Sequence, residues 1–245
     1  VNTYTGNTTI NSGVLRLDKT GAALASTLNT DLIMNGGTLL KSSNSIADTA
    51  SVTINGGAFI MDTTTSSGNN GSAETINNLT MTGGSVAGSG GSNSALTING
   101  NMTLSGGQVR LNGGGDIIVL GSTTLNGGVL DARPSSSASS FTALTTLQAL
   151  SIVNKESGAY TPLIVTGSAT NFGAQVTLNG NVTFTGNGNN TNTVLINSSD
   201  ISLANQGLIS LNGTRTFNIG NGAAAVDLSI IPALTNGTTT GGLTK

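Results

Sequence analysis

The sequence has no cysteine, no histidine and no tryptophan, and only 7% of its residues are charged. The absence of cysteine excludes a disulfide framework. The absence of both cysteine and histidine excludes Ser-His-Asp and Cys-His catalysis and most zinc or iron sites. We therefore expect a protein that is not an enzyme and that binds no metal and no cofactor.

Charge and hydropathy argue against two further classes of partner. The net charge is −2, and Arg16, Arg110, Arg133 and Arg215 lie far apart in the sequence. The sequence therefore shows no basic patch of the kind that would predict binding to nucleic acid. No apolar run approaches the roughly 18 residues that a membrane-spanning helix needs. We expect no nucleic-acid partner and no membrane span.

Small polar residues dominate the chain. Glycine (36 residues), threonine (38), asparagine (30) and serine (28) make up more than half of the 245 residues. Such a composition can indicate disorder, but 36% of the residues are hydrophobic and they fall in short alternating runs. These runs predict a core made of many thin slices rather than one globular centre.

One motif recurs along the chain. The stretch Leu32–Leu39 (LIMNGGTL) reads as a short strand, an Asn-Gly-Gly corner and a second strand. Its third position recurs at intervals of 20 to 27 residues, at Ile10, Met34, Ile54, Met81, Leu104 and Leu125. Strand-like motifs at such a period are the signature of a solenoid.

A longer variant of the motif extends the pattern. Leu96–Leu104 is matched position by position by Val176–Phe184, and a weaker copy covers Ile209–Thr214. Between these copies, Ser151–Val153 and Pro162–Val165 have the composition of strands. The repeat therefore continues through most of the chain.

We predict an all-β fold in which residues 1–245 form one right-handed parallel β-helix of about ten to eleven coils. Val, Ile and Thr favour a pleated, half-buried surface, and Asn-Gly tolerates the positive φ of a sharp corner. Because the motifs recur at nearly constant phase, each can stack on the next. An antiparallel β-meander or sandwich built from Asn-Gly hairpins is the alternative fold.

Three stretches depart from the repeat and are expected to loop out of the rod, near residues 63–74, 133–150 and 186–193. Within the second stretch, apolar residues at 141, 144, 147 and 150 have the spacing of a helix. We therefore predict a short helix over residues 141–152.

The chain ends resemble the two halves of a known motif. Asn2–Leu15 (NTYTGNTTINSGVL) resembles the second half of the autotransporter-associated β-strand repeat, also called the passenger-associated transport repeat, and Gly241–Lys245 (GGLTK) resembles its opening. The resemblance implies a right-handed parallel β-helix in a large bacterial protein that is secreted or exposed on the cell surface.

Because the motif is split between the two ends, we expect the chain to be one unit of a tandem array or of a filament that stacks end to end. An uncapped β-helix end exposes unpaired backbone groups and a slice of core, which favours such addition. The residues expected to take part in self-association are Asn2, Tyr4, Thr8, Ile10, Leu15, Gly241, Gly242, Leu243 and Lys245.

Two other functions stay open at this stage. Asp116 and Asp131 could face one groove near Arg110 or Arg133, as in β-helix enzymes that act on carbohydrates, or they could be solvated turn residues. Outward columns of threonine and asparagine could bind glycans, as in an adhesin passenger, or ice, or could simply stabilise the face through ladder contacts. The sequence favours a non-catalytic extracellular structural module that has itself as partner, with glycans or a cell surface as the alternative.

Overall fold

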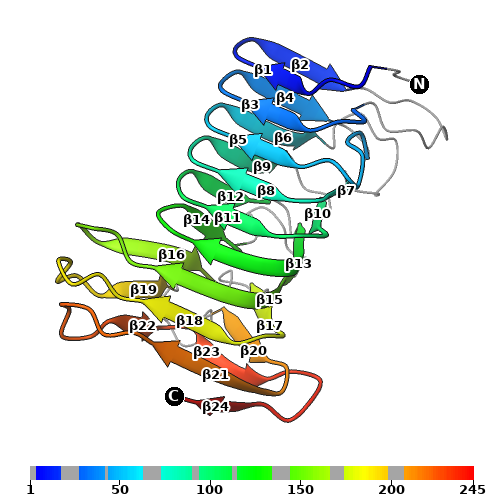
Figure 1. Ribbon diagram of the computed structural model, residues 1–245. Coiled ribbons are helices and arrows are strands. Elements are labelled where there is room, and N and C mark those ends of the chain that lie inside the picture. The colour runs from blue at the N-terminus through cyan, green and yellow to red at the C-terminus, as the bar shows by residue number, and fades with distance from the viewer. Residues whose placement is uncertain are drawn as a thin grey trace.

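The computed structural model describes residues 4–17, 28–41, 44–62, 73–89, 94–111, 115–133, 144–165, 174–197 and 207–245. In these residues every strand pairs in parallel with strands of neighbouring coils, and the coils stack into a right-handed parallel β-helix (Figure 1). The predicted fold is confirmed, and the antiparallel meander or sandwich is wrong. No helix in the described part of the chain is long and apolar enough to cross a membrane.

Two sheets run along the rod, here called sheet A and sheet B. In the described residues, sheet B contains β2 (Val14–Leu17), β4 (Thr38–Lys41), β6 (Ala58–Asp62), β9 (Ser85–Ser89), β12 (Gln108–Arg110), β14 (Val129–Asp131), β16 (Tyr160–Ile164), β19 (Val194–Asn197) and β22 (Leu228–Ile230).

Sheet A has two flanks that meet at a bend. The main flank contains β1 (Thr8–Ile10), β3 (Leu32–Met34), β5 (Val52–Ile54), β8 (Leu79–Met81), β11 (Met102–Leu104), β18 (Val182–Thr185) and β21 (Thr214–Ile219). β24 (Gly242–Thr244) pairs with Thr214–Thr216 of β21, just before the main-flank positions. The leading flank, which the chain enters first in each coil, contains β7 (Ala73–Ile76), β10 (Ala95–Ile98), β17 (Gln175–Leu178), β20 (Leu208–Leu211) and β23 (Ala233–Asn236). The long strands β13 (Asp116–Leu125) and β15 (Leu144–Val153) span both flanks.

The core consists of columns of inward side chains that run from coil to coil. The six motif positions at Ile10, Met34, Ile54, Met81, Leu104 and Leu125 lie in one column, as the repeat predicts. This column continues through Ile152 and Phe184 to Ile219. The matched segments at Leu96–Leu104 and Val176–Phe184 also take equivalent places, because each crosses from the leading flank to the main flank.

Two of the three predicted loop-outs need correction. Ala73 and Glu74 belong to β7, and residues 63–72 lie outside the described residues. Residues 144–150 belong to β15, so the second loop-out does not reach that far and the predicted helix over 141–152 is wrong for its described part, 144–152. Residues 186–193 connect β18 to β19 without strand structure, as predicted.

The bend in sheet A accounts for the last step of the false helix signal, from Leu147 to Leu150. The register between β13 and β15 shifts between Val119 and Ser122, where β13 has one residue more than β15. The two buried side chains on either side of the bend in β15 are Leu147 and Leu150, three residues apart. A change of phase inside a strand therefore has the spacing that is typical of a helix.

Candidate functional site: the two ends of the solenoid

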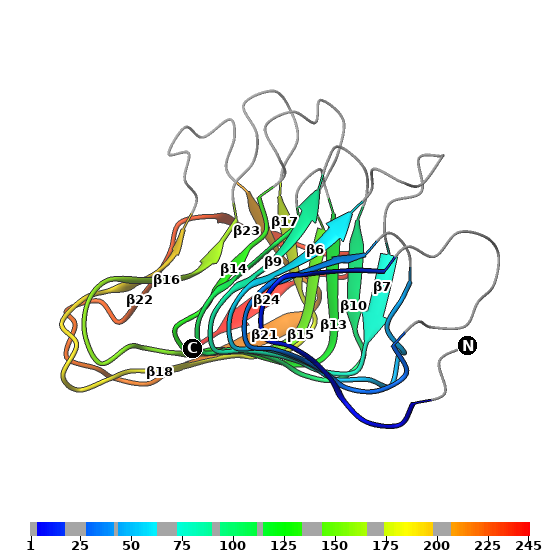
Figure 2. The same cartoon turned by 90° about the horizontal axis from the view of Figure 1, so that it is seen from above.

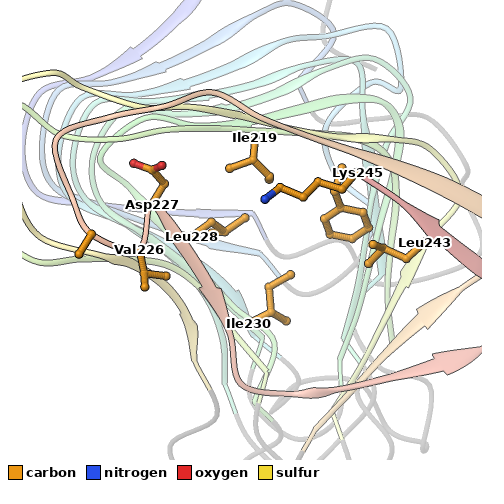
Figure 3. A pocket seen from close by; sticks show the side chains of 9 residues that line it. Ile219, Val226, Asp227, Leu228, Ile230, Leu243 and Lys245 are labelled. Carbon is orange, nitrogen blue, oxygen red and sulfur yellow. The ribbon is translucent and has the colours of Figure 1, made fainter.

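The C-terminal end of the rod is an open slice of the core. A hollow of about 390 Å³ lies there, between the last strands of both sheets (Figure 3). It is lined by Phe217, Ile219, Ala225, Val226, Asp227, Leu228, Ile230, Leu243 and Lys245. Val226 is 53% exposed and Leu243 is 50% exposed, so large apolar side chains face solvent at this end.

The hollow exists because the inward columns end there. Phe217 and Ile219 pair with Val182 and Phe184 of the coil before, and β22 pairs with β19. β24 covers only Thr214–Thr216 of β21. In the described residues, Phe217–Ile219 and β22 therefore have a strand neighbour on one side only. Such an edge presents unpaired N–H and C=O groups together with apolar surface.

The N-terminal end is different. Among the described residues β1 pairs only with β3, and β2 only with β4. Ile10 is nevertheless only 6% exposed, and Leu15 is half-buried against the core. Residues 4–7 belong to no strand and are exposed, and Figure 2 shows this segment at the periphery of the rod. The Tyr4 hydroxyl lies 2.8 Å from Thr8 Oγ1, and Thr30 Oγ1 donates to the Gly6 carbonyl at 2.8 Å.

The predicted self-association residues fall into two groups at opposite ends of the rod (Figure 1). Tyr4, Thr8, Ile10 and Leu15 lie at the N-terminal end, Gly241, Gly242, Leu243 and Lys245 lie at the C-terminal end, and Asn2 lies outside the described residues. Within one chain the structure does not bring the two groups together.

Sequence reasoning missed the floor of the hollow, which Phe217, Ile219, Leu228 and Ile230 form. The apolar alternation of the repeat could have identified Phe217 and Ile219, because they take the column positions of Val182 and Phe184 in the next coil. The longer, irregular step between these coils concealed it, since 35 residues separate Val182 from Phe217.

Outside the ends, one charged pair is fully enclosed in the core. Lys41 Nζ lies 3.2 Å from Glu74 Oε2, and neither side chain is exposed. The backbone N–H groups of Ser45 and Ile46 donate to the same carboxylate at 3.0 and 3.3 Å. Burial lowers the pKa of Lys41 and raises the pKa of Glu74, and the mutual attraction opposes both changes. The enclosure indicates a structural role, since no ligand can reach the pair.

A second charged cluster surrounds Asp131. Arg133 Nε donates to Asp131 Oδ1 at 2.7 Å, Gln108 Nε2 donates to Oδ2 at 3.0 Å, and Arg110 Nε lies 3.7 Å from Oδ2. Both arginines therefore lie near this carboxylate, as the sequence suggested. Asp131 is buried, so its interpretation as a solvated turn residue is wrong.

Asp116 is not part of this cluster. It lies on the leading flank of sheet A, whereas Asp131 lies in sheet B, and Asp116 Oδ1 accepts a hydrogen bond from the Leu144 N–H at 3.1 Å. Burial raises the pKa of Asp116. The two carboxylates that the carbohydrate-cleaving hypothesis singles out therefore belong to different sheets.

Comparisons with protein-family models, with curated proteins and with solved structures find no match to this chain. The resemblance of the chain ends to the autotransporter-associated repeat therefore stays a prediction.

Proposed function

We propose that this chain is a non-catalytic structural module of a bacterial protein that works outside the cell or on its surface, and that it associates end to end with a second copy. The second copy is a separate molecule or the next unit of a tandem array. The observation that carries the proposal is the open hollow at the C-terminal end, where apolar side chains and unpaired strand edges lie together.

End-to-end contact would cover the exposed apolar side chains of this surface and pair its free strand edges. Strands added to β22 and to Phe217–Ile219 would pair their free backbone groups, and inward side chains of the added coil would fill the hollow. Apolar surface that leaves water contributes roughly 25 cal/mol per Å². Parallel strand addition at an exposed edge is a general mode of protein association.

The described architecture suits a mechanical role. The parallel ladder places interstrand hydrogen bonds along the rod axis, and the outer face of sheet A adds side-chain bonds between coils. Charged residues make up only 7% of the sequence, so long-range repulsion between neighbouring rods is weak. A rod assembled from such units would extend the same core from one unit to the next.

Sedimentation and electron microscopy over a concentration series test the proposal. We expect the particle to lengthen without widening as concentration rises. Val226→Asp combined with Leu243→Asp should abolish this growth, because both side chains are exposed at the hollow and the charges would oppose its closure. Leu120→Asp is the matched control, since Leu120 is 51% exposed on β13, away from either end. A wild-type chain that remains a uniform monomer at high concentration would overturn the proposal.

A neutral glycan is the second candidate ligand, supported by one observation. A hollow of about 260 Å³ is lined only by uncharged residues, namely Gln175, Thr177, Ser210, Asn212, Asn236, Gly237 and Thr238. Amide and hydroxyl groups can exchange hydrogen bonds with sugar hydroxyls. Isothermal titration with neutral oligosaccharides tests this function, and Ser210→Ala should then weaken any binding detected.

A further inference from the structure

We infer that Asn187 is a site of spontaneous modification, at which the backbone nitrogen of Gly188 attacks the side-chain amide and the amide is converted to a carboxylate. Both residues lie in the connection 186–193 between β18 and β19. No step of this reaction depends on end-to-end association. The Asn-Gly sequences of the chain differ in how their backbone nitrogens are held, and this difference selects Asn187.

Asn-Gly sequences offer this reaction the least steric resistance, because glycine has no Cβ beside the attacking nitrogen. The chain contains eleven of them, and nine lie in the described residues. The nine begin at Asn35, Asn55, Asn99, Asn126, Asn179, Asn187, Asn212, Asn221 and Asn236, whereas those at Asn70 and Asn112 lie outside the described residues.

The conversion has two steps. The peptide nitrogen of Gly188 gives up its proton and bonds to Cγ of Asn187, and the side-chain amide group leaves with that proton as ammonia. Water then opens the resulting imide ring at either carbonyl and yields aspartate or isoaspartate. The first step therefore needs a peptide N–H that can lose its proton and a backbone that can turn toward the side chain.

Most of the described sites hold the glycine N–H in a hydrogen bond. In the early corners Gly36 and Gly56 donate to the carbonyl oxygens of Ile10 and Met34 in the coil below, both at 3.3 Å. The other glycines held in this way are Gly100, Gly127, Gly213, Gly222 and Gly237. A donated proton is harder to remove, and a backbone stacked on its neighbour cannot turn.

The site at Asn179 is blocked by packing instead. Among the described residues the Gly180 N–H has no hydrogen-bond partner, but a Cβ on Gly180 would overlap the carbonyl oxygen of Gln148. Asn179 Oδ1 also accepts a hydrogen bond from Asn212 Nδ2 at 3.0 Å. The backbone therefore lies against the coil below, and the side chain is tied to the coil above.

Asn187 is the exception. Gly188 is exposed, its N–H has no partner within the described part of the chain, and beyond its chain neighbours no atom lies within 4 Å of the place of a Cβ. The Asn189 N–H donates to Asn187 Oδ1 at 3.0 Å, which folds the side chain back over the following peptide. The same bond polarises the carbonyl that Gly188 attacks, as the donor of an oxyanion hole does.

Conversion at this position would loosen the late corners. The Asn190 N–H donates to the Asn187 carbonyl at 3.2 Å, and the Asn190 side chain joins this turn to Lys155 and Gly158. Isoaspartate lengthens the backbone by the methylene of its side chain and so displaces the turn. We expect converted chains to lose hydrogen-exchange protection around residues 154–160.

Incubation in isotopically heavy water at mildly alkaline pH tests the site, because ring opening adds one oxygen atom from water to each converted residue. Peptide mapping by mass spectrometry then locates the label. In the folded chain we expect Asn187 to convert at least tenfold faster than Asn35 or Asn55, whereas in urea all three should convert at similar rates. Equal rates in the folded chain, or an Asn187 that stays intact while the unfolded chain converts, would overturn the inference.

Gly188→Ala tests the attacking residue, because Gly188 has no positive φ and the space around it accepts a Cβ that would shield its nitrogen. Conversion of Asn187 should slow at least tenfold with no change in thermal unfolding. Gly6→Ala is the matched control, since Gly6 has equally open surroundings but does not follow an asparagine. An undiminished rate in Gly188→Ala would exclude Gly188 as the attacking residue and overturn the mechanism.

Discussion

The first coils and the last coils of this rod turn the same corner between sheet A and sheet B in different ways. Early corners are short and contain a glycine with positive φ, as at Gly37 and Gly57. Later corners are long, spanning residues 154–159, 186–193 and 220–227, and Figure 2 shows these connections extending beyond the early ones. Parallel strand pairing continues through both regions, so stacking does not depend on one corner geometry.

Early corners are stabilised by the backbone and by the coil below. Gly57 has a φ of 82°, and a Cβ there would overlap the carbonyl oxygen of Gly37. Beside it runs a ladder in which Asn35 Nδ2 donates to Asn11 Oδ1 and Asn55 Nδ2 donates to Asn35 Oδ1, both at 2.9 Å. Only glycine allows such close stacking in this conformation.

Late corners are stabilised by single buried side chains. Asn190 donates to the carbonyl oxygens of Lys155 and Gly158 at 3.1 and 3.0 Å and so joins two successive corners. The Tyr160 hydroxyl accepts from the Gly127 N–H at 2.7 Å and donates to the Gly128 carbonyl at 2.9 Å. The backbone of a long corner is less constrained than that of a short glycine corner. In the late corners, side-chain hydrogen bonds provide the constraint instead.

The largest effect is expected in the interior of the first coils. Glu74 lies in an inward column whose other members include Leu96, Ile117 and Val176. Of these four residues, only Glu74, in the early part of the core, carries a charge. Glu74→Ala should cost about 3–5 kcal/mol in chemical denaturation, because it leaves Lys41 buried without its partner. Lys41→Met combined with Glu74→Leu should recover most of that loss. A small effect of Glu74→Ala would show that the pair is not enclosed.

The next effect separates the two kinds of corner. Gly158 has a φ of 81° but no atom near the position of a Cβ, whereas Gly57 has close neighbours there. Gly158→Ala should cost about 1–2 kcal/mol from the left-handed conformation alone. Gly57→Ala should cost about 1–3 kcal/mol more, because the coil below must move. Equal losses in thermal or urea unfolding would contradict the stacking argument.

Asn190→Ala should destabilise the late corners by about 2 kcal/mol, because Asn190 is 2% exposed and its loss removes the hydrogen-bond donor of the buried Asn154 side chain and of the Lys155 and Gly158 carbonyl groups. Hydrogen exchange should show the loss of protection confined to residues around 154–160 and 187–192. Asn189→Ala, a substitution in the same loop at an exposed side chain, is the control.

Tyr160 makes the late corners sensitive to alkaline pH. Burial raises the pKa of Tyr160 to about 12, against a smaller lowering effect of the hydrogen bond from Gly127. A folded-state pKa above the ordinary value of about 10 means that the folded protein holds this proton more tightly than the unfolded chain does. Stability should therefore fall as pH rises from about 10 to 12.

The ultraviolet titration of Tyr4→Phe checks this prediction, because Tyr160 is then the only tyrosine and the chain has no tryptophan. Tyr160→Phe should lose the alkaline decline and should cost about 1–2 kcal/mol at neutral pH from its two hydrogen bonds. A Tyr160 that titrates near 10 would contradict its placement.

The smallest effect is expected for the early asparagine ladder. Asn55→Ala removes bonds to Asn35 and to Thr82, but Asn55 is exposed and water can replace its partners. We expect a loss of about 0.5–1 kcal/mol in thermal unfolding. A loss as large as that of Asn190→Ala would erase the distinction between the two kinds of corner.

The sequence by itself determined the coil. Alternating apolar residues, the Asn-Gly-Gly corner and the phase of the repeat predict parallel stacking and place Ile10, Met34 and Ile54 in one column, as the structure confirms. These features are local, because strand alternation and a glycine corner depend on residues a few positions apart.

Only the tertiary structure decided what depends on distant parts of the chain. The bend that breaks the phase of β15, the Lys41–Glu74 pair 33 residues apart and the position of Arg110 near Asp131 all arise from contacts between coils. The hollow over Ile219 and Ile230 also depends on contacts between coils. The end of an inward column can be located only when the position of every preceding coil is known. The loops between coils vary in length, and no local pattern records which residues they bring together.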